Sequence, residues 1–320
     1  MQAGTFRRAF VVGAYLPDGG TVMAYHLGRI LEHDFGIRAF AVTLDGETPG
    51  ARSTEYDLRM PVVTREQMEQ QITSDDVLIV NAGFSRFLFG WRIPGFKICY
   101  VQGFAQFNLL DRRLDHYVAV SDVVCRFLNT VYGISANVIP PFINLDRFGP
   151  SPDWSARPET VVLPYRKGIP DVWALSFSRL QEILATSAPH ITLGEPLAGP
   201  MPQHELLSRI ASARYLLMLS AAEGFGLVPL EAMAMGTLVV GYDGYGGRHY
   251  MRPGENCAVA PYAEIERVAA LLIDAVADPA HALAMVERGR ATAGGFTYAA
   301  FRAAWVKEFS AVLKMSPFTP

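Results

Sequence analysis

The chain contains little cysteine and no long apolar segment. Its 320 residues include three cysteines at scattered positions, with no Cys-x-x-Cys pair and no accompanying histidine. They are Cys99, Cys125 and Cys257. This arrangement indicates neither a disulfide framework nor a zinc site. No apolar run approaches the ~20 residues of a membrane span, and the run Ala9–Leu16 is too short for a secretory signal. We therefore expect a protein of the reducing cytoplasm.

Positive charge is also limited. The formal net charge is −3 and the sequence pI is about 6.2, whereas a nucleic-acid-binding protein normally shows a basic domain. We therefore expect no nucleic-acid partner. Lysine is scarce, with 4 Lys against 24 Arg, and no Asp-x-Asp sequence occurs. With so few lysines, one that directly follows an apolar strand is a candidate functional residue.

Short apolar strands alternate with amphipathic helices along most of the chain. In the first half the predicted strands are Phe10–Ala14, Arg38–Thr43, Val77–Asn81, Lys97–Val101, His116–Val120 and Val138–Ile139. Between them lie amphipathic segments such as Thr21–His33 and Asp122–Tyr132. This pattern is typical of doubly wound parallel α/β sheets. Pro140, Pro141 and the proline-rich segment 149–158 then interrupt it, and the second half repeats the alternation. Half of the residues are hydrophobic, enough for two cores, so we expect two domains.

The most informative segment is Ser220–Gly236. It follows the apolar run Arg214–Leu219, which is typical of a buried parallel strand. Gly224 and Gly226 allow a sharp turn close to a ligand, and Pro229 suits the first turn of a helix. A helix that begins there points unpaired N–H groups and its positive dipole end at the sheet edge, where they can hold a phosphate.

A second glycine loop is expected at the same edge. The strand Thr237–Gly241 completes a βαβ unit and leads into Asp243–Gly247. Ligands of open α/β sheets bind at the carboxyl edge of the strands. The alternative interpretation is an ordinary βαβ unit whose two glutamates, Glu223 and Glu231, are merely solvated.

From Ser220 to Gly236 the chain resembles the retaining glycosyltransferases of family 4, which have the GT-B fold. Their E-x7-E signature runs Ser, a short gap, Glu-Gly-Phe-Gly, a few apolar residues and Glu-Ala-Met-Ala-x-Gly. The resemblance implies that Glu231 binds the ribose hydroxyls of a nucleotide and that Glu223 contacts hydroxyls of the donor sugar. It also implies that a backbone segment cradles the diphosphate. The residues of that segment are Gly224, Phe225, Gly226 and Leu227.

A basic pair follows another predicted strand of the same half. Thr160–Leu163 is apolar, and Arg166 and Lys167 come shortly after it, before Gly168. In the resembled family an Arg and a Lys at this place neutralise the donor pyrophosphate, usually several residues apart. Here they are adjacent, which makes Lys167 the better match. The alternative is a solvated turn.

The first half carries weaker marks of the family. Gly19 and Gly20 resemble a Gly-Gly loop whose backbone faces the donor phosphates, although a plain β-to-α turn has the same sequence. Many family members have a histidine after the strand equivalent to Lys97–Val101, and here that position is Gln102. An amide can bond a sugar hydroxyl but cannot titrate, so a histidine base at this place is excluded.

The resemblance implies two Rossmann-like domains that face each other across a cleft. Residues 1–142 would form the acceptor-side domain, residues 143–297 would bind the nucleotide sugar, and the helix 298–314 would cross back onto the first domain. The implied activity is sugar transfer, with retention of configuration, from a nucleoside diphosphate to a glycan, glycolipid or small molecule. No cofactor and no metal are expected, because the basic pair can replace a divalent cation.

Two other functions fit the same motif. A non-catalytic nucleotide-sugar-binding subunit of a transferase complex would explain the missing histidine. Another GT-B enzyme, such as a nucleotide-sugar epimerase, would need an acid/base set that the first half lacks.

The acceptor side is less defined. The segment Phe84–Lys97 interleaves aromatic residues with three cations. The preferred interpretation is that its aromatics pack in the core. The alternative is that the segment contacts a membrane interface or a lipid-linked glycan, at the inner membrane face.

Overall fold

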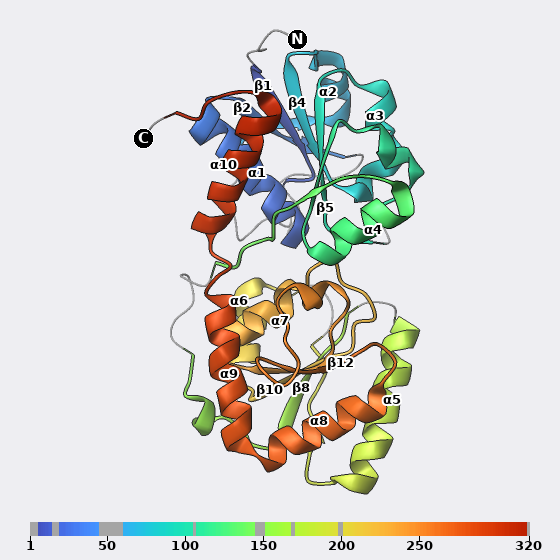
Figure 1. Ribbon diagram of the computed structural model, residues 1–320, viewed down its shortest axis with the longest axis vertical. Helices are drawn as coiled ribbons and strands as arrows, with labels where there is room; N and C mark the ends of the chain where they lie inside the picture. Colours follow the sequence, from blue (N-terminus) through green and yellow to red (C-terminus); the bar gives the residue numbers. More distant parts are fainter. Residues whose placement is uncertain are drawn as a thin grey trace. The chain divides into compact units, whose positions relative to one another are not determined.

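The computed structural model describes residues 6–14, 19–44, 60–104, 107–144, 151–167, 170–197 and 201–318. The chain divides into two compact units (Figure 1). Unit 1 comprises Met1–Phe142 and Tyr298–Pro320, and unit 2 comprises Ile143–Thr297. Gly168, which belongs to the predicted basic turn, lies outside the described residues.

Unit 1 is built on a seven-stranded sheet in the order β3-β2-β1-β4-β5-β6-β7, with every strand pair parallel. The strands are β1 Arg8–Val12, β2 Arg38–Thr43, β3 Val62–Thr64, β4 Asp76–Val80, β5 Phe96–Val101, β6 His116–Ala119 and β7 Asn137–Val138. The strand order reverses between β1 and β4, which is the topological switch point where ligands of such sheets bind.

Helices accompany this sheet, and two short 3-10 helices follow β4 and β5. They are α1 Gly19–Phe35, α2 Arg65–Gln71, α3 Phe89–Arg92, α4 Asp122–Tyr132, α10 Tyr298–Leu313, η1 Ala82–Phe87 and η2 Leu109–Arg113. The Ser121 side chain accepts a hydrogen bond from Val124 N and caps α4. The sequence did not predict β3 and α2, because β3 has only three residues and none of them is buried.

The last helix, α10, packs beside α1 in unit 1 (Figure 1). Arg302 of α10 bonds the buried Asp34 at the end of α1. Glu308 accepts hydrogen bonds from Asn137 and pairs with His116. Trp305 is fully buried between these two anchors. The C-terminal helix therefore completes the core of unit 1, although most of the chain separates it from α1.

Unit 2 has a five-stranded parallel sheet in the order β12-β11-β10-β8-β9. Its strands are β8 Val161–Tyr165, β9 Thr192–Leu193, β10 Tyr215–Met218, β11 Leu238–Tyr242 and β12 Ala258–Ala260. Its helices are α5 Pro170–Ser187, α6 Gln203–Ala211, α7 Leu227–Ala234, α8 Ile265–Ala277, α9 Pro279–Ala293, η3 Trp154–Ala156 and η4 Gly246–His249. Strand β8 extends through Pro164, where the sequence predicted a loop. This proline pairs with Leu217 of the neighbouring strand.

Strands β10 and β11 approach each other closely at Gly241. Its φ is +135°, and a Cβ at this position would lie 1.9 Å from the carbonyl oxygen of Met218. No side chain fits there. Only glycine allows these two central strands to pair up to the point where they deliver their loops.

A buried arginine fixes the C-terminal end of α7. Arg157 is 3% exposed and donates to the carbonyl oxygens of Met235 and Gly236 and to the Thr237 hydroxyl. Burial, together with a smaller effect of the nearby Arg290, lowers its pKa to about 10. The cation meets the negative end of the helix dipole, a favourable position. The helix that begins at the ligand edge of the sheet is thereby held at its opposite end.

Candidate functional site

Three neighbouring strands of unit 2 end at one edge of the sheet because they run parallel. Met218, the last residue of β10, pairs with Tyr165 of β8 and with Gly241 of β11. The residues that follow these strands are therefore neighbours. The structure brings Lys167, which follows β8, together with Glu223, which follows β10.

Glu223 and Lys167 form an ion pair. Lys167 Nζ lies 2.8 Å from Glu223 Oε2. The glutamate side chain is 11% exposed and the lysine side chain is 48% exposed. A pair this accessible to solvent adds little to stability, on the order of 0–1 kcal/mol. Its main consequence is chemical, since it fixes a carboxylate and an ammonium group side by side at the ligand edge.

Arg166 lies in a different environment from its neighbour Lys167. Its guanidinium is 5.8 Å from the centre of the Trp173 ring, on α5, and its backbone N–H donates to the Leu197 carbonyl. Of the predicted basic pair, only Lys167 is bonded to Glu223 among the described residues.

The loop after β11 clamps the backbone of Glu223. Glu223 N–H donates to the Gly244 carbonyl at 2.7 Å, and Gly246 N–H donates to the Glu223 carbonyl at 3.1 Å. A Cβ on Gly246 would lie 2.4 Å from the Glu223 oxygen and from the Gly224 carbonyl carbon. The predicted second glycine loop therefore positions the first signature glutamate through direct backbone contact.

Tyr245 occupies a strained turn within this loop. Its φ of 61° and ψ of −55°, with a 2.7 Å bond from Gly246 N–H to the Gly244 carbonyl, define a γ-turn of the rare form. Such backbone costs of order 1–3 kcal/mol for a residue other than glycine and is concentrated at functional sites. The Tyr245 ring lies under the Arg248 guanidinium, and Asp243 accepts hydrogen bonds from both residues.

The N-terminus of α7 faces the same edge. Gly226, in the left-handed region with φ 89°, occupies the N-cap position and offers no capping side chain. Its carbonyl accepts a hydrogen bond from the buried Tyr250 hydroxyl. Phe225 is buried against Tyr250 and Phe296, so its ring anchors the loop inward. The first N–H groups of α7 are thus presented by an anchored turn that suits an anion.

Glu231 lies one turn into α7 and is 6% exposed. Its Oε1 accepts a 2.8 Å hydrogen bond from Gln203 Nε2, on α6. Burial raises the pKa of Tyr165, and the charges of Glu223 and Glu231 raise it further against the opposing effect of Lys167. The two signature carboxylates and the lysine therefore all act electrostatically on the half-buried Tyr165 hydroxyl, at the end of β8.

The sequence did not assign roles to four polar residues of this cluster. They are Gln203, Asp243, Tyr245 and Arg248. The last three fall within or next to the predicted glycine loop, and polar residues at a carboxyl edge are the signal that could have found them. Gln203 comes from a separate helix, and no local pattern marks it.

In unit 1 the structure brings two predicted residues together. Gln102 follows β5, and its Nε2 donates a 2.8 Å hydrogen bond to the carbonyl of Gly20. Gly19 and Gly20 are the first residues of α1, which therefore begins two residues before the predicted helix. The Gln102 amide is committed to the backbone at the start of this helix.

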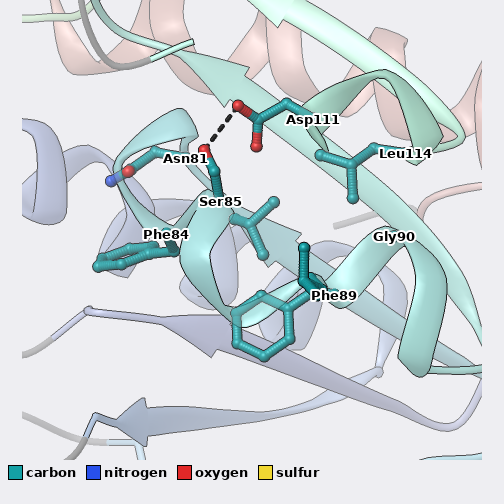
Figure 2. Close-up of a pocket in the computed structure, with 9 residues that line it drawn as sticks. Asn81, Phe84, Ser85, Phe89, Gly90, Asp111 and Leu114 are labelled. Atoms are coloured by element: carbon teal, nitrogen blue, oxygen red, sulfur yellow. Dashed lines mark hydrogen bonds between the residues drawn. The ribbon is translucent and has the colours of Figure 1, made fainter. Parts of the chain in front are cut away.

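Unit 1 also has a small pocket at the carboxyl end of β4 (Figure 2). The Ser85 hydroxyl lies 2.7 Å from Asp111 Oδ2, and Asn108 N–H donates to the same oxygen. Asp111 is 4% exposed. Burial raises its pKa, while the bonds from Ser85 and Asn108 oppose the rise. Asp111 is thus a buried carboxyl group that ties η2 to η1.

The aromatic and cationic segment 84–97 divides between core and surface. Phe87, Phe89 and Ile93 are buried, as the preferred interpretation predicted. Trp91 is 58% exposed, and the guanidinium of Arg113 lies 4.3 Å from its ring centre.

Within the described residues, no group of three or more His, Cys, Asp or Glu side chains is arranged to hold a metal ion.

Comparison with known proteins identifies the architecture. Residues 197–292 match the family model of glycosyl transferases group 1. This stretch lies within unit 2 and contains both signature glutamates and the loop that clamps Glu223. The fold is GT-B. The predicted fold class is thus confirmed.

Solved structures of this fold superpose on nearly the whole chain. Sucrose-phosphate synthase from Thermosynechococcus elongatus has a TM-score of 0.69 at 17% identity and covers 96% of this chain and 100% of its own. Anabaena HepE, in complex with UDP and glucose, has a TM-score of 0.71 at 13% identity with the same coverage. The α,α-trehalose-phosphate synthase (UDP-forming) from Burkholderia vietnamiensis has a TM-score of 0.70 at 12% identity, covering 95% and 100%. No protein of curated function matches the sequence.

Proposed function

We propose that this GT-B protein is a retaining glycosyltransferase that uses a nucleoside-diphosphate sugar. The observation that carries the proposal is the cluster at the carboxyl edge of unit 2. There the Glu223–Lys167 ion pair and Glu231 lie with the N-terminus of an anchored helix. The carboxylates, the ammonium group and the backbone N–H groups together match a ligand that has hydroxyls next to a diphosphate.

Each part of the donor has a matching group. The first N–H groups of α7 and the Lys167 ammonium suit the diphosphate. Glu231, oriented by Gln203, suits a pair of ribose hydroxyls, because a carboxylate accepts two hydrogen bonds. Glu223 suits hydroxyls of the sugar. Solved relatives in complex with UDP, such as HepE and Staphylococcus aureus TarM, support a nucleotide donor of this kind.

The reaction we propose needs no side-chain base. The bond between the anomeric carbon and the diphosphate oxygen breaks, and the acceptor oxygen bonds that carbon on the same face. The acceptor hydroxyl proton passes to the departing phosphate oxygen. Negative charge grows on the diphosphate, where Lys167 and the dipole of α7 stabilise it. Such electrostatic stabilisation of the transition state is usually the largest contribution to catalysis in sites of this type. Gln102 cannot titrate, which agrees with this scheme.

We also propose that transfer is independent of metal ions and that the acceptor is a glycan or glycolipid. Lys167 would supply the positive charge that a divalent cation supplies elsewhere, with Arg166 as a second, more distant cation. A TarM structure that contains fondaparinux, a glycan, gives support by analogy to a glycan acceptor.

The test is a donor panel. The protein is incubated with UDP-, GDP-, ADP- and dTDP-sugars, with and without EDTA, and with simple acceptors or water. Proton NMR then follows nucleotide release and the anomeric configuration of the product. One nucleotide class turned over with retention, equally in EDTA, supports the proposal. Inversion, or activity that EDTA abolishes, would refute the mechanism.

A second candidate function is a non-catalytic nucleotide-sugar-binding subunit. The observation that favours it is Gln102, whose amide is bonded to the Gly20 carbonyl at the place where many family members have a histidine. This candidate predicts that a nucleotide sugar binds in unit 2 without turnover. Binding and turnover are measured separately in the panel, so the two functions are distinguished.

A further inference from the structure

Unit 1 exposes a compact group of aromatic, aliphatic and cationic side chains. It lies on η1, α3 and η2, and we name it the Trp91 surface. Its members are Arg86, Trp91, Arg92, Leu109, Arg112 and Arg113. Leu109 is 68% exposed and Trp91 is 58% exposed. The other three tryptophans of the chain, Trp154, Trp173 and Trp305, are all buried.

The elements of this surface are packed tightly together. A Cβ on Gly90 of α3 would lie 2.8 Å from the Arg113 carbonyl oxygen of η2, so the two backbones are in contact. This contact sets Trp91 beside Arg113, whose guanidinium lies 4.3 Å from the ring centre. The exposed ring and the cation are therefore held as one unit.

The Trp91 surface is positively charged in a chain of negative net charge. Segment 84–115 contains five basic and two acidic residues, whereas the whole chain has a net charge of −3. One of the acids, Asp111, is buried, and the other, Asp115, lies 3.1 Å from Lys97. Glu69 lies 3.3 Å from Arg92. Among the described residues, no carboxylate lies within 4.0 Å of Arg86, Arg112 or Arg113. The electrostatic potential outside this surface is therefore set mainly by arginine side chains.

Buried polar groups connect the 3-10 helices η1 and η2 beneath this surface. Asp111 Oδ2 lies 2.7 Å from the Ser85 hydroxyl and accepts a hydrogen bond from Asn108 N–H, and the Tyr117 hydroxyl donates to the Asp111 carbonyl. Figure 2 shows the bond between Ser85 of η1 and Asp111 of η2. The inner aromatics Phe87 and Phe89 are buried, whereas Trp91 and Leu109 are exposed on the outer face.

We propose that the Trp91 surface docks on the anionic headgroup layer of a membrane. Tryptophan favours the membrane–water interface, because its ring is apolar and its indole N–H is polar. Each arginine near an anionic lipid surface adds about 1 kcal/mol of attraction. Two exposed apolar side chains and several cations give reversible, salt-sensitive docking rather than permanent anchoring. The proposal concerns unit 1 only and does not rest on the proposed transfer reaction.

In the described part of the chain, no single helix is long and apolar enough to span a membrane. Among the helices that the structure describes, one pair, Ile265–Ala277 and Pro279–Leu313, passes the length and composition test together, and it is bent by 106°.

The test is sedimentation with vesicles of phosphatidylcholine alone or mixed with phosphatidylglycerol. We expect the full-length protein to bind only the anionic vesicles and to be released at high salt. Because Trp91 is the one tryptophan of the four with an exposed side chain, its fluorescence reports the contact directly. Binding should shift the emission to the blue and should protect it from acrylamide.

Variants locate the surface. Arg112→Glu with Arg113→Glu should weaken vesicle binding about tenfold or more, since two attractive charges become repulsive. Arg86→Glu with Arg112→Glu should do the same without disturbing the stack on Trp91. Arg179→Glu with Arg267→Glu makes the same charge change on unit 2, and Leu175→Ser removes an exposed leucine there that is 74% exposed. Both controls should bind like the wild type.

Three results would overturn the proposal. They are no binding of the wild type to anionic vesicles at low salt, equal weakening by the surface and control variants, and binding to soluble heparin but not to vesicles. Thermal unfolding checks that each variant folds. Nucleotide binding, measured in parallel, distinguishes a failure of this surface from a failure of the donor site in unit 2.

Discussion

The two units share one architecture and differ in what their sheet edges carry. Each has a parallel sheet accompanied by helices. In unit 2 two adjacent strands end in a carboxylate and an ammonium group, Glu223 and Lys167, joined at 2.8 Å. In unit 1 strand β5 ends in the uncharged Gln102, and basic residues gather instead on the Trp91 surface. The match to the group 1 glycosyl transferases falls wholly within unit 2. In both units the parallel sheet determines where the loops meet, while the residues of those loops determine the chemistry.

The largest expected effect is on catalysis in unit 2. Replacing Lys167 with Ala should lower kcat by about 10²–10³-fold, because the departing diphosphate loses a fixed positive charge. Arg166→Ala is the matched control, and it should cost less because that guanidinium packs over Trp173. Steady-state kinetics on the active donor provides the measurement. Equal losses in the two variants would refute the assignment of this charge to Lys167.

Nucleotide affinity should depend on unit 2 and not on unit 1. Glu231→Ala removes the carboxylate that Gln203 orients, and we expect the affinity for the nucleotide itself to fall about 10- to 100-fold, the range for a bond to a charged group. Gln102→Ala should leave this affinity unchanged, and Glu223→Gln should spare it while suppressing transfer. Isothermal titration calorimetry tests all three. A Glu231→Ala protein that binds as tightly as the wild type would contradict the site.

Stability should respond to glycine replacement where strands β10 and β11 meet. Gly241→Ala forces a Cβ to within 1.9 Å of the Met218 carbonyl oxygen, so we expect a loss of at least about 1–3 kcal/mol in the free energy of unfolding. Gly254→Ala is the control in the same unit, since its φ is also positive, at +78°, with nothing within 4 Å of the added atom. Urea denaturation measures both. Similar losses would show that backbone strain, not the close approach, limits Gly241.

Acid should weaken unit 1 before unit 2. Burial raises the pKa of Asp76, but bonds from Arg8 and Thr73 outweigh it and leave the pKa below the usual 3.8. The bond with His116 lowers the pKa of Glu308 from 4.5 in spite of burial. Because both pKa values are lower in the folded state, the stability they contribute is present at neutral pH. It is lost as pH falls from about 5 through the folded pKa values.

Hydrogen exchange at a series of pH values from 7 to 4 checks this order. We expect β4 and α10 of unit 1 to lose protection first, and Asp76→Asn to flatten the pH dependence. Earlier loss of protection in β10 of unit 2 would contradict the prediction.

The smallest expected effect separates stability from function within the loop of unit 2. Tyr245→Gly should relieve the γ-turn and raise the free energy of unfolding by up to about 1–3 kcal/mol, while transfer falls because the Tyr245–Arg248 pair beside Glu223 is lost. Tyr245→Ala, which keeps the strain, is the control and should gain no stability. Thermal unfolding and activity are compared for both. A gain in stability with full activity would mean that the tyrosine side chain has no part in the site.

Much of the fold could be predicted because buried parallel strands are continuous apolar runs. The segments that became β4, β5 and β10 were found in this way. Strand β3 was missed because its short, incompletely buried edge has no such run. Pro164 was expected to end β8, yet it lies inside the strand. A local sequence pattern does not show whether the neighbouring strand can pair with a given residue.

The arrangement of the candidate site residues was partly predictable for a related reason. Glu223 and Lys167 follow strands with a clear local signal, and Glu231 lies one turn into the helix that comes next. The parallel sheet brings the ends of those strands together. Gln203, by contrast, comes from a helix whose packing against α7 is a tertiary property. The exposure of Trp91 among buried aromatics could not be predicted either, because short 3-10 segments have no long apolar period to reveal their inner face.

The most direct test of the central claim is thermal stabilisation of the protein by UDP, GDP, ADP and dTDP, with and without EDTA, for the wild type and Glu231→Ala. Ligand at a hundred times its dissociation constant should add about 2.7 kcal/mol of stability. We predict that one nucleotide raises the Tm of the wild type, that EDTA makes no difference, and that the rise is lost in Glu231→Ala. No rise with any nucleotide, or the same rise in the variant, would contradict a nucleotide-sugar site at Glu223–Glu231.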